Sequence, residues 1–279
     1  MVRVERHDIK NIQNFIKLGF ESELSDLPSK PESALATWKM ARGVQIDLER
    51  LAVLGSLVPA PTEVRRAIRI ASDCIACLFS CGAGQPSVLI DGKPVAFDSV
   101  SDNSILNASE WIDAFYLGCI ARRTENLDAL CKIPLQMIRQ STTVDLDFRY
   151  SFVETLQAMH LKWPNPETGE LLLSALEQTD PDQYILRAPD WVLSLDVEQL
   201  GLLGRFLSGD TVAFESALIK AVHSHKQFWS KKEDRRKDST GFLSFPLTAI
   251  ASLAYDNGFR FDLDSEYVPM WLVTGESAR

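Results

Sequence analysis

The sequence lacks the short motifs that mark most enzymes. It contains no phosphate-binding glycine loop, no G-x-S-x-G nucleophile turn, no H-E-x-x-H zinc motif and no dinucleotide-binding fingerprint. Only four histidines occur in 279 residues, and no serine or cysteine lies in a recognisable nucleophile context. The sequence therefore predicts no enzymatic activity, no cofactor and no resident metal.

Long hydrophobic runs are also missing. No stretch reaches the roughly 18–20 apolar residues that a membrane helix needs. Residues 1–8 mix charges of both signs and contain no apolar core of the kind that a secretory signal has. We therefore expect a soluble cytoplasmic protein with no membrane partner.

Basic residues are scarce in one segment. Residues 141–219 contain 4 basic and 13 acidic side chains, so their net charge (4 − 13 = −9) equals that of the whole chain. The segment at 220–240 is basic, with 7 basic and 3 acidic side chains. Phosphate binding needs a basic surface, so a nucleic-acid partner is disfavoured. A basic protein partner is compatible with the acidic segment, although a solvated helix face is the simpler interpretation.

Helical periodicity dominates the chain. Apolar residues recur at three- and four-residue steps in 33–55 and 62–80, and again in 144–161, 167–178, 197–207, 210–228 and 246–256. The sequence thus predicts an all-α protein with many antiparallel helices. The two exceptions are a short β-hairpin near residues 87–98, around the turn dipeptide Asp91-Gly92, and a short extended segment near 259–264. The charged stretch 231–238 is expected to be an exposed loop.

The domain organisation is predicted to be a single helical domain over residues 1–279. A subdivision near residues 135–143 is the alternative, because a break at Ile133-Pro134 and a polar connector at 141–143 interrupt the helical pattern there. No repeat of fixed period is present to indicate a helical array.

Two clusters of potential metal ligands have simpler structural interpretations. Cys74, Cys77 and Cys81 share a helix face, but no fourth ligand at zinc-site spacing follows them, so buried thiols are favoured over a metal or redox site. Cys119 and Cys131 make an odd total of five, which favours reduced thiols. The pair His223 and His225 would point about 200° apart on a helix and therefore would not chelate one ion there.

Three acidic residues alternate near the C-terminus. In an extended segment, Asp262, Asp264 and Glu266 would share one face. This arrangement is compatible with a solvated edge, a docking surface for a basic partner or a divalent-cation site. The sequence leaves these three interpretations open.

The last sixty residues carry a family resemblance. The succession runs through Ala221–Trp229, Gly241–Leu247, Ala249–Gly258 and Asp264–Val273. It resembles the C-terminal part of the immunity protein 49 family of bacterial polymorphic toxin systems. Members of that family close with a small-residue helix, a glycine turn, an extended segment and a Ser-x-Tyr-[Leu/Val]-Pro-x-Trp-Leu ending. The resemblance is close over residues 214–273 and looser upstream, at Trp38–Arg42, Leu48–Arg50 and Glu110–Ala114.

The resemblance implies a mainly helical fold and an antitoxin role. A protein of this family binds a cognate toxin, encoded next to it in the genome, and protects the producing bacterium during competition. The family offers no inhibitory residues to carry over. Tyr267, Pro269 and Trp271 of the closing motif are predicted to be packing anchors that dock the chain end onto the helix at 246–256, and not toxin contacts.

We therefore predict an immunity protein that covers the active site of its toxin with an acidic surface. The candidate toxin-binding residues are Asp180, Asp182, Asp190, Asp196, Glu198, His223, Lys226, Asp262, Asp264 and Glu266. The alternatives are a helical interaction scaffold or homodimer that serves another partner, and a metal-dependent enzyme that uses the cysteine or carboxylate cluster.

Overall fold

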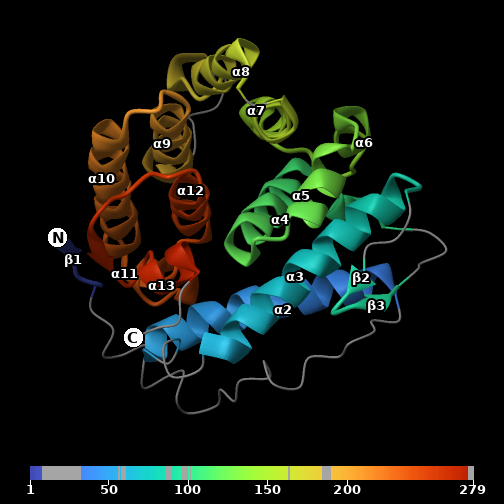
Figure 1. Cartoon of the computed structure of the whole chain (residues 1–279), viewed down its shortest axis with the longest axis horizontal. Helices are drawn as coiled ribbons and strands as arrows, with labels where there is room; N and C mark the ends of the chain where they lie inside the picture. Colours follow the sequence, from blue (N-terminus) through green and yellow to red (C-terminus); the bar gives the residue numbers. More distant parts are fainter. Residues whose placement is uncertain are drawn as a thin grey trace. The chain divides into compact units, whose positions relative to one another are not determined.

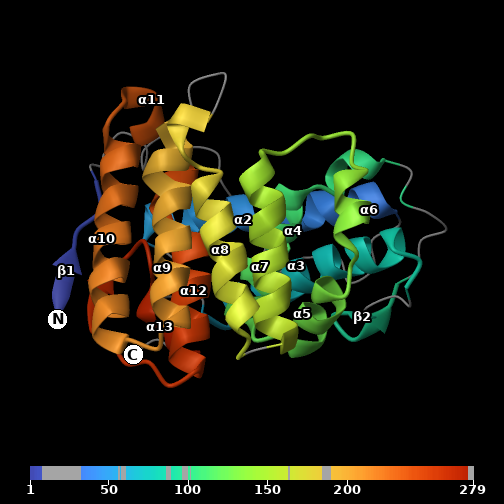
Figure 2. The same ribbon diagram turned by 90° about the horizontal axis from the view of Figure 1, so that it is seen from above.

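The computed structural model describes residues 1–7, 33–55, 57, 61–85, 89–95, 100, 102–162, 164–183 and 190–275. Most of these residues lie in α-helices, and the described strands have only two or three residues each (Figures 1 and 2). The predicted all-α class is therefore confirmed. None of the described helices is long and apolar enough to cross a membrane.

The chain divides into two compact units. The C-terminal unit consists of Met1–Ser25, Ile46–Val64 and Thr179–Arg279, and the central unit consists of Asp26–Gln45 and Arg65–Gln178. Helices α2 (Ala34–Leu54) and α3 (Pro61–Gly82) each begin in one unit and end in the other. Residues 135–143 lie inside the central unit. The prediction that residues 1–279 form a single domain stays a prediction.

The central unit is built from helices and one hairpin. After α3 come strands β2 (Leu89–Ile90) and β3 (Lys93–Pro94), a 3-10 turn (Asn103–Ile105), and helices α4 (Ala108–Ala121), α5 (Thr124–Cys131), α6 (Leu135–Arg139), α7 (Asp147–Lys162) and α8 (Pro166–Glu177). Helices α7 and α8 pack side by side (Figure 2). The core contains the fully buried rings of Phe79, Trp111, Phe115, Tyr116 and Phe148.

Strands β2 and β3 pair antiparallel, which confirms the predicted hairpin. Asp91 and Gly92 both have positive φ angles, of 48° and 75°, as the tight two-residue turn requires. Pro94 lies at the end of the pairing, opposite Leu89. A proline is tolerated in this place because the hairpin has only two strands and its outer edge needs no ladder donor.

The C-terminal unit contains the remaining elements. They are strand β1 (Val2–Val4), a 3-10 turn (Pro181–Gln183), a π-helical turn (Val192–Asp196), helices α9 (Val197–Leu207), α10 (Thr211–Ser230) and α11 (Glu233–Arg236), a second 3-10 turn (Ser239–Phe242), helix α12 (Phe245–Asp256), strand β4 (Leu263–Ser265) and helix α13 (Met270–Thr274). Helices α9 and α10 pack together (Figure 2), and the rings of Phe206, Phe214 and Phe259 meet with centroids 5.3–5.5 Å apart.

Side-chain caps fix where the long helices begin. Asp210 accepts the backbone N–H of Ala213 at 2.9 Å at the start of α10, as its position in the sequence predicts. Ser244 caps α12 in the same way, and Pro246 lies in the first turn of that helix, where its missing N–H has no cost. Gly258 ends the helix with a φ of 91°.

One local prediction needs correction. The charged stretch 231–238 was expected to be a loop, but its residues 233–236 form the short helix α11, in which acidic residues precede basic ones in the order that the helix dipole favours. The extended segment predicted near 259–264 is present, and strand β4 at 263–265 overlaps its end. The strand lies there because β1 pairs with it, in parallel, through Val2 and Leu263, Arg3 and Asp264, and Val4 and Ser265.

The closing motif anchors the chain end, as predicted. Tyr267 is fully buried, and its carbonyl oxygen accepts the backbone N–H of Ser244 at 2.9 Å, immediately before α12. Helices α12 and α13 pack against each other. Pro269 is also buried and precedes the first turn of α13. The motif is therefore part of the core of the C-terminal unit.

Candidate functional site

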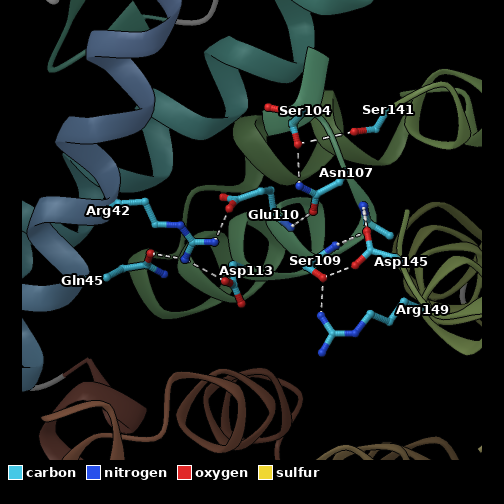
Figure 3. A network of polar contacts seen from close by, with 11 residues as sticks. Arg42, Gln45, Ser104, Asn107, Ser109, Glu110, Asp113, Ser141, Asp145 and Arg149 are labelled. Carbon is cyan, nitrogen blue, oxygen red and sulfur yellow. Dashed lines mark hydrogen bonds and ion pairs between the residues drawn. The ribbon is translucent and has the colours of Figure 1, made fainter. Parts of the chain in front are cut away.

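A network of polar contacts surrounds the start of helix α4 in the central unit (Figure 3). Asn107 accepts the N–H of Glu110 at 2.9 Å, and Asp145 accepts the N–H of Ala108 at 2.8 Å. The hydroxyl of Ser109 donates to Asp145 and accepts from Arg149 (Figure 3). Both hydrogen-bonding roles of this hydroxyl are thus used to fasten helix α7 to helix α4. The network satisfies backbone donors at the start of helix α4.

The same network includes a half-buried cation on α2. The guanidinium of Arg42 lies 2.6 Å from a carboxylate oxygen of Glu110, 2.8 Å from Asp113 and 2.6 Å from the side-chain oxygen of Gln45 (Figure 3). Burial opposes the charge of Arg42, but Asp113 and Glu110 together raise its pKa. Burial raises the pKa of Glu110, and Arg42 opposes this effect. Asn107 and Glu110 have the spacing of a capping box, but only the Asn107 half of it forms, because the Glu110 side chain binds Arg42.

A buried carboxylate holds the hairpin in place. Asp73 on α3 accepts from Arg123 at 3.0 Å, from the side-chain amide of Asn126 at 2.8 Å and from the backbone N–H of Asp91 at 3.1 Å. The carboxylate of Asp91 in turn pairs with Arg66 at 3.0 Å. These contacts explain how an otherwise short β2–β3 hairpin is held in a helical unit.

The predicted carboxylates of the C-terminal unit are largely engaged in ion pairs. Asp190 lies 3.0 Å from Arg235 and 3.5 Å from Lys231, and the hydrogen bond from Arg235 lowers the pKa of this carboxyl. Glu198 lies 2.9 Å from the Nζ of Lys220. The basic segment that follows α10 therefore neutralises part of the acidic segment.

The alternating carboxylates near the C-terminus face the N-terminal residues. The amino group of Met1 lies 2.7 Å from Asp262, and Arg3 lies 3.7 Å from Asp264. The guanidinium of Arg6 lies 2.6 Å from Glu266. Asp262 raises the pKa of the terminal amino group by accepting its hydrogen bond. The three carboxylates therefore hold the first residues of the chain.

The predicted histidine and lysine lie on α10. His223 is exposed and Lys226 is half-buried, as residues off the apolar stripe should be. His225 is buried on the opposite side, and its Nε2 lies 3.1 Å from the carbonyl oxygen of Gly241. A carbonyl only accepts, so Nε2 carries the proton. Burial lowers the pKa of His225 to about 4, which agrees with its predicted structural role.

The remaining predicted carboxylates differ in exposure. Asp180 and Asp182 are exposed, and Asp180 accepts the N–H of Asp182 at 3.0 Å in the turn after α8. Asp196 is half-buried at the end of the π-helical turn. The structure therefore does not bring the ten predicted residues together in one cluster of side chains. Whether any of them binds a toxin stays a prediction.

Helix α8 has a different kind of acidic surface. Glu167, Glu170 and Glu177 are exposed on one face, and Leu173 between them is 61% exposed. The helix contains no lysine or arginine, and in the described part of the chain no ion pair links these glutamates to a basic side chain. Glu167 and Glu170, three residues apart, repel each other, and the helix supplies no basic side chain to neutralise them.

The cysteines fit the predicted structural role. Cys74, Cys77, Cys119 and Cys131 are buried, Cys81 is half-buried, and none of the five forms a disulfide. Burial raises the pKa of Cys74 well above that of an ordinary thiol. Among the described residues, no three histidine, cysteine, aspartate or glutamate side chains gather to hold a metal ion.

Sequence reasoning missed the Arg42 contacts and the role of the first seven residues. Trp38–Arg42 and Glu110–Ala114 each stood out only as loose family matches, and the structure joins them through the ion pair of Arg42 with Glu110. Nothing in either helical pattern predicts that pairing. The cations Arg3 and Arg6 near the start of the chain were the sequence signal that could have suggested partners for these carboxylates.

By fold, the chain is a mainly α-helical protein whose described polar networks hold helix ends and chain segments together. The family can be named more narrowly. The model of the family Immunity protein 49 matches residues 55–272, and the chain belongs to this family. This result confirms the resemblance at the C-terminus and extends it across both units. Searches of curated proteins and of solved structures found no match.

Proposed function

We propose that this protein binds a cognate bacterial toxin in the cytoplasm and neutralises it by covering its active site with an acidic surface. Membership of the Immunity protein 49 family supports the antidote role. The toxin is expected to be basic at the contact and to be encoded next to this chain. Nothing in this role requires a cofactor or a catalytic residue.

The exposed face of helix α8 is the observation that carries the acidic-surface part of the proposal. Its glutamates have no basic partner in the described part of the chain, so their charge is directed to solvent. Leu173 adds an exposed apolar side chain beside these glutamates. Opposite charge across an interface accelerates encounter, and an apolar contact excludes water from it. Asp180 and Asp182 follow α8 in the chain and extend the acidic sequence.

Of the other candidates, Asp190 suits this role less well. Its carboxylate is already shared by Lys231 and Arg235, so a toxin would have to compete with both cations. A triple charge reversal at Asp180, Asp182 and Asp190 would therefore break internal pairs as well as change the surface. A reversal at Glu170 and Glu177 avoids this difficulty, because no ion pair is lost.

The proposal is tested by coexpression with the product of the neighbouring toxin gene. We expect the two proteins to copurify as a complex of defined mass by light scattering, and the producing cells to grow. Toxicity that persists in the presence of the intact protein, together with the absence of a complex, would overturn the antidote role. A stable homodimer that does not bind the toxin would instead support the scaffold alternative.

A further inference from the structure

The first seven residues are fastened to the segment 262–267 within the C-terminal unit. Strands β1 and β4 pair over three residues, and the cations at positions 1, 3 and 6 face the carboxylates at 262, 264 and 266. Most of these ion pairs are exposed, and such pairs contribute little to stability. The buried attachment is made by Val4 and His7.

His7 makes the closest contacts of this attachment. Its backbone N–H donates to the hydroxyl of Tyr267 at 2.9 Å, and its ring Nδ1 lies 2.8 Å from the same oxygen. The ring of Phe242 lies 4.3 Å from the imidazole, centroid to centroid. One hydroxyl therefore binds both the backbone and the side chain of His7. Burial raises the pKa of Tyr267 to about 12, so the hydroxyl stays neutral at physiological pH.

The surroundings of His7 disfavour a positive charge. Burial lowers the pKa of His7, and so do the charges of Lys226 on α10, Arg6 beside it and Arg236 on α11, while a backbone contact with Arg236 opposes them. The nearest carboxylate neighbour in sequence to Tyr267, Glu266, is engaged by Arg6. The second histidine of the cluster, His225, is itself buried and lies with its ring centroid 5.1 Å from that of Tyr267.

We propose that residues 1–7 form a clasp that is closed at neutral pH and opens on acidification, and that protonation of His7 releases it. In the open state the imidazolium moves to water, away from the burial and from the charges of Lys226 and Arg236 that disfavour it in the closed clasp. Opening also withdraws the cations of the N-terminal segment from Asp262, Asp264 and Glu266. These carboxylates then become available to a basic partner.

The direction of the pH effect follows from proton linkage. The pKa of His7 is lower in the closed clasp than in an open chain, so the open state binds the proton more tightly. The full stability of the clasp is present above the ordinary histidine pKa of about 6.5, and it is lost as the pH falls below that value. At pH 5 the opening equilibrium rises by up to ~30-fold if His7 stays neutral in the closed state.

Amide hydrogen exchange of His7 measures this opening directly, because its N–H is bound to Tyr267. After correction for the intrinsic exchange rate, we expect the protection of this amide to fall by up to ~30-fold between pH 7.5 and pH 5. The Val222 amide of α10 should stay more strongly protected than the His7 amide at both pH values, which distinguishes local opening from unfolding of the unit. In a His7→Phe variant the clasp should keep its protection over the same range. His223→Phe, which removes an exposed histidine of α10, is the matched control and should behave like the unmodified chain.

Two results would overturn the proposal. One is protection of the His7 amide that does not change between the two pH values. The other is an equal acid-induced loss of protection in the His7→Phe chain. If the clasp does not close in the His7→Phe variant, the proposal is tested by titrating the ring protons of His7 in the unmodified chain. A titration midpoint at or above pH 6.5 would contradict a clasp released by protonation of His7. Tyr267→Phe should expose the His7 amide even at pH 7.5.

Discussion

The acidic residues of the C-terminal unit and those of helix α8 are equally conspicuous in the sequence, but the fold uses them differently. In the C-terminal unit, carboxylates meet cations from other segments: Asp190, Glu198, Asp262, Asp264 and Glu266. On α8, the glutamates have no basic partner in the described part of the chain. The first group therefore pairs chain segments at the surface, where each pair contributes little to stability, and the second carries charge without a basic partner among the described residues.

A third group of carboxylates is buried and bound to other groups within the protein. Asp73 is almost completely buried and accepts three hydrogen bonds, and Glu110 binds Arg42 in the network at the start of α4. Negative charge in this protein thus ranges from buried and shared, through exposed and paired, to exposed and unpaired. Substitutions should therefore lower the free energy of unfolding most in the buried group, less in the exposed and paired group, and least in the exposed and unpaired group.

The largest loss of stability is expected from Asp73→Ala. This change removes the carboxylate that Arg123 contacts, leaves the buried amide of Asn126 with Ser72 as its acceptor, and frees the N–H of Asp91. Breaking a buried charge pair on one side costs about 3–5 kcal/mol in the free energy of unfolding. Urea denaturation measures it, with Glu177→Ala on α8 as the exposed comparison. A loss for Asp73→Ala no greater than for Glu177→Ala would refute the distinction between the two groups.

Acid should destabilise the C-terminal unit through His225. Its pKa of about 4 in the folded protein lies below the unfolded value of about 6.5, so the folded state binds the proton less tightly. The associated stability is present above pH 6.5 and is lost as the pH falls toward 4, by roughly 3 kcal/mol in total. Urea midpoints between pH 7.5 and 4 measure this. His225→Phe should show a shallower decline than His223→Phe, and parallel declines would contradict the assignment.

Removing an exposed but paired carboxylate should lower the free energy of unfolding less than Asp73→Ala does. Glu266→Gln takes away the partner of Arg6, and we expect a loss of at most about 1 kcal/mol in the free energy of unfolding. The loss should shrink at high salt, because the pair is open to solvent. Glu170→Gln on α8 is the control without an ion pair. An effect of Glu266→Gln that equals that of Asp73→Ala would mean that the pair is not the surface contact described here.

The smallest effect on stability is expected from reversing charge on α8. The double variant Glu170→Lys with Glu177→Lys relieves the repulsion between Glu167 and Glu170 and places a cation at the last residue of the helix. The free energy of unfolding should change by less than about 0.5 kcal/mol, with a gain more consistent than a loss. Thermal unfolding of the variant and of the unmodified chain measures this. A melting temperature several degrees lower in the variant would contradict the description of these glutamates as unpaired.

Much of the helical fold was predictable because apolar periodicity and caps are local signals. The cap residues Asn107 and Asp210 and the hairpin turn at Asp91-Gly92 each depend on residues within four positions of sequence, and the structure contains all three features. The strand pairing of residues 2–4 with 263–265 has no such local signal. It joins segments that are far apart in the chain and depends on where the whole C-terminal unit places them.

The candidate site was harder to predict for the same reason. The sequence identifies an acidic segment, but whether a carboxylate is paired depends on cations supplied by distant elements. Asp190 meets Arg235 and Glu198 meets Lys220 only after α10 and α11 have packed. Asp262 and its two neighbours were open to three interpretations until the N-terminal cations were located. The sequence shows where the carboxylates are concentrated, but the tertiary structure determines which of them are paired with cations.

The central claim is that the α8 face meets the toxin, and association kinetics test it most directly. The rate constant for binding the cognate toxin at low ionic strength should fall about tenfold in Glu170→Lys with Glu177→Lys, and the difference should vanish at high salt. Glu63→Lys with Glu125→Lys, at exposed positions outside α8, makes the same change in net charge and should slow association far less. Equal rates for the two double variants would contradict the claim.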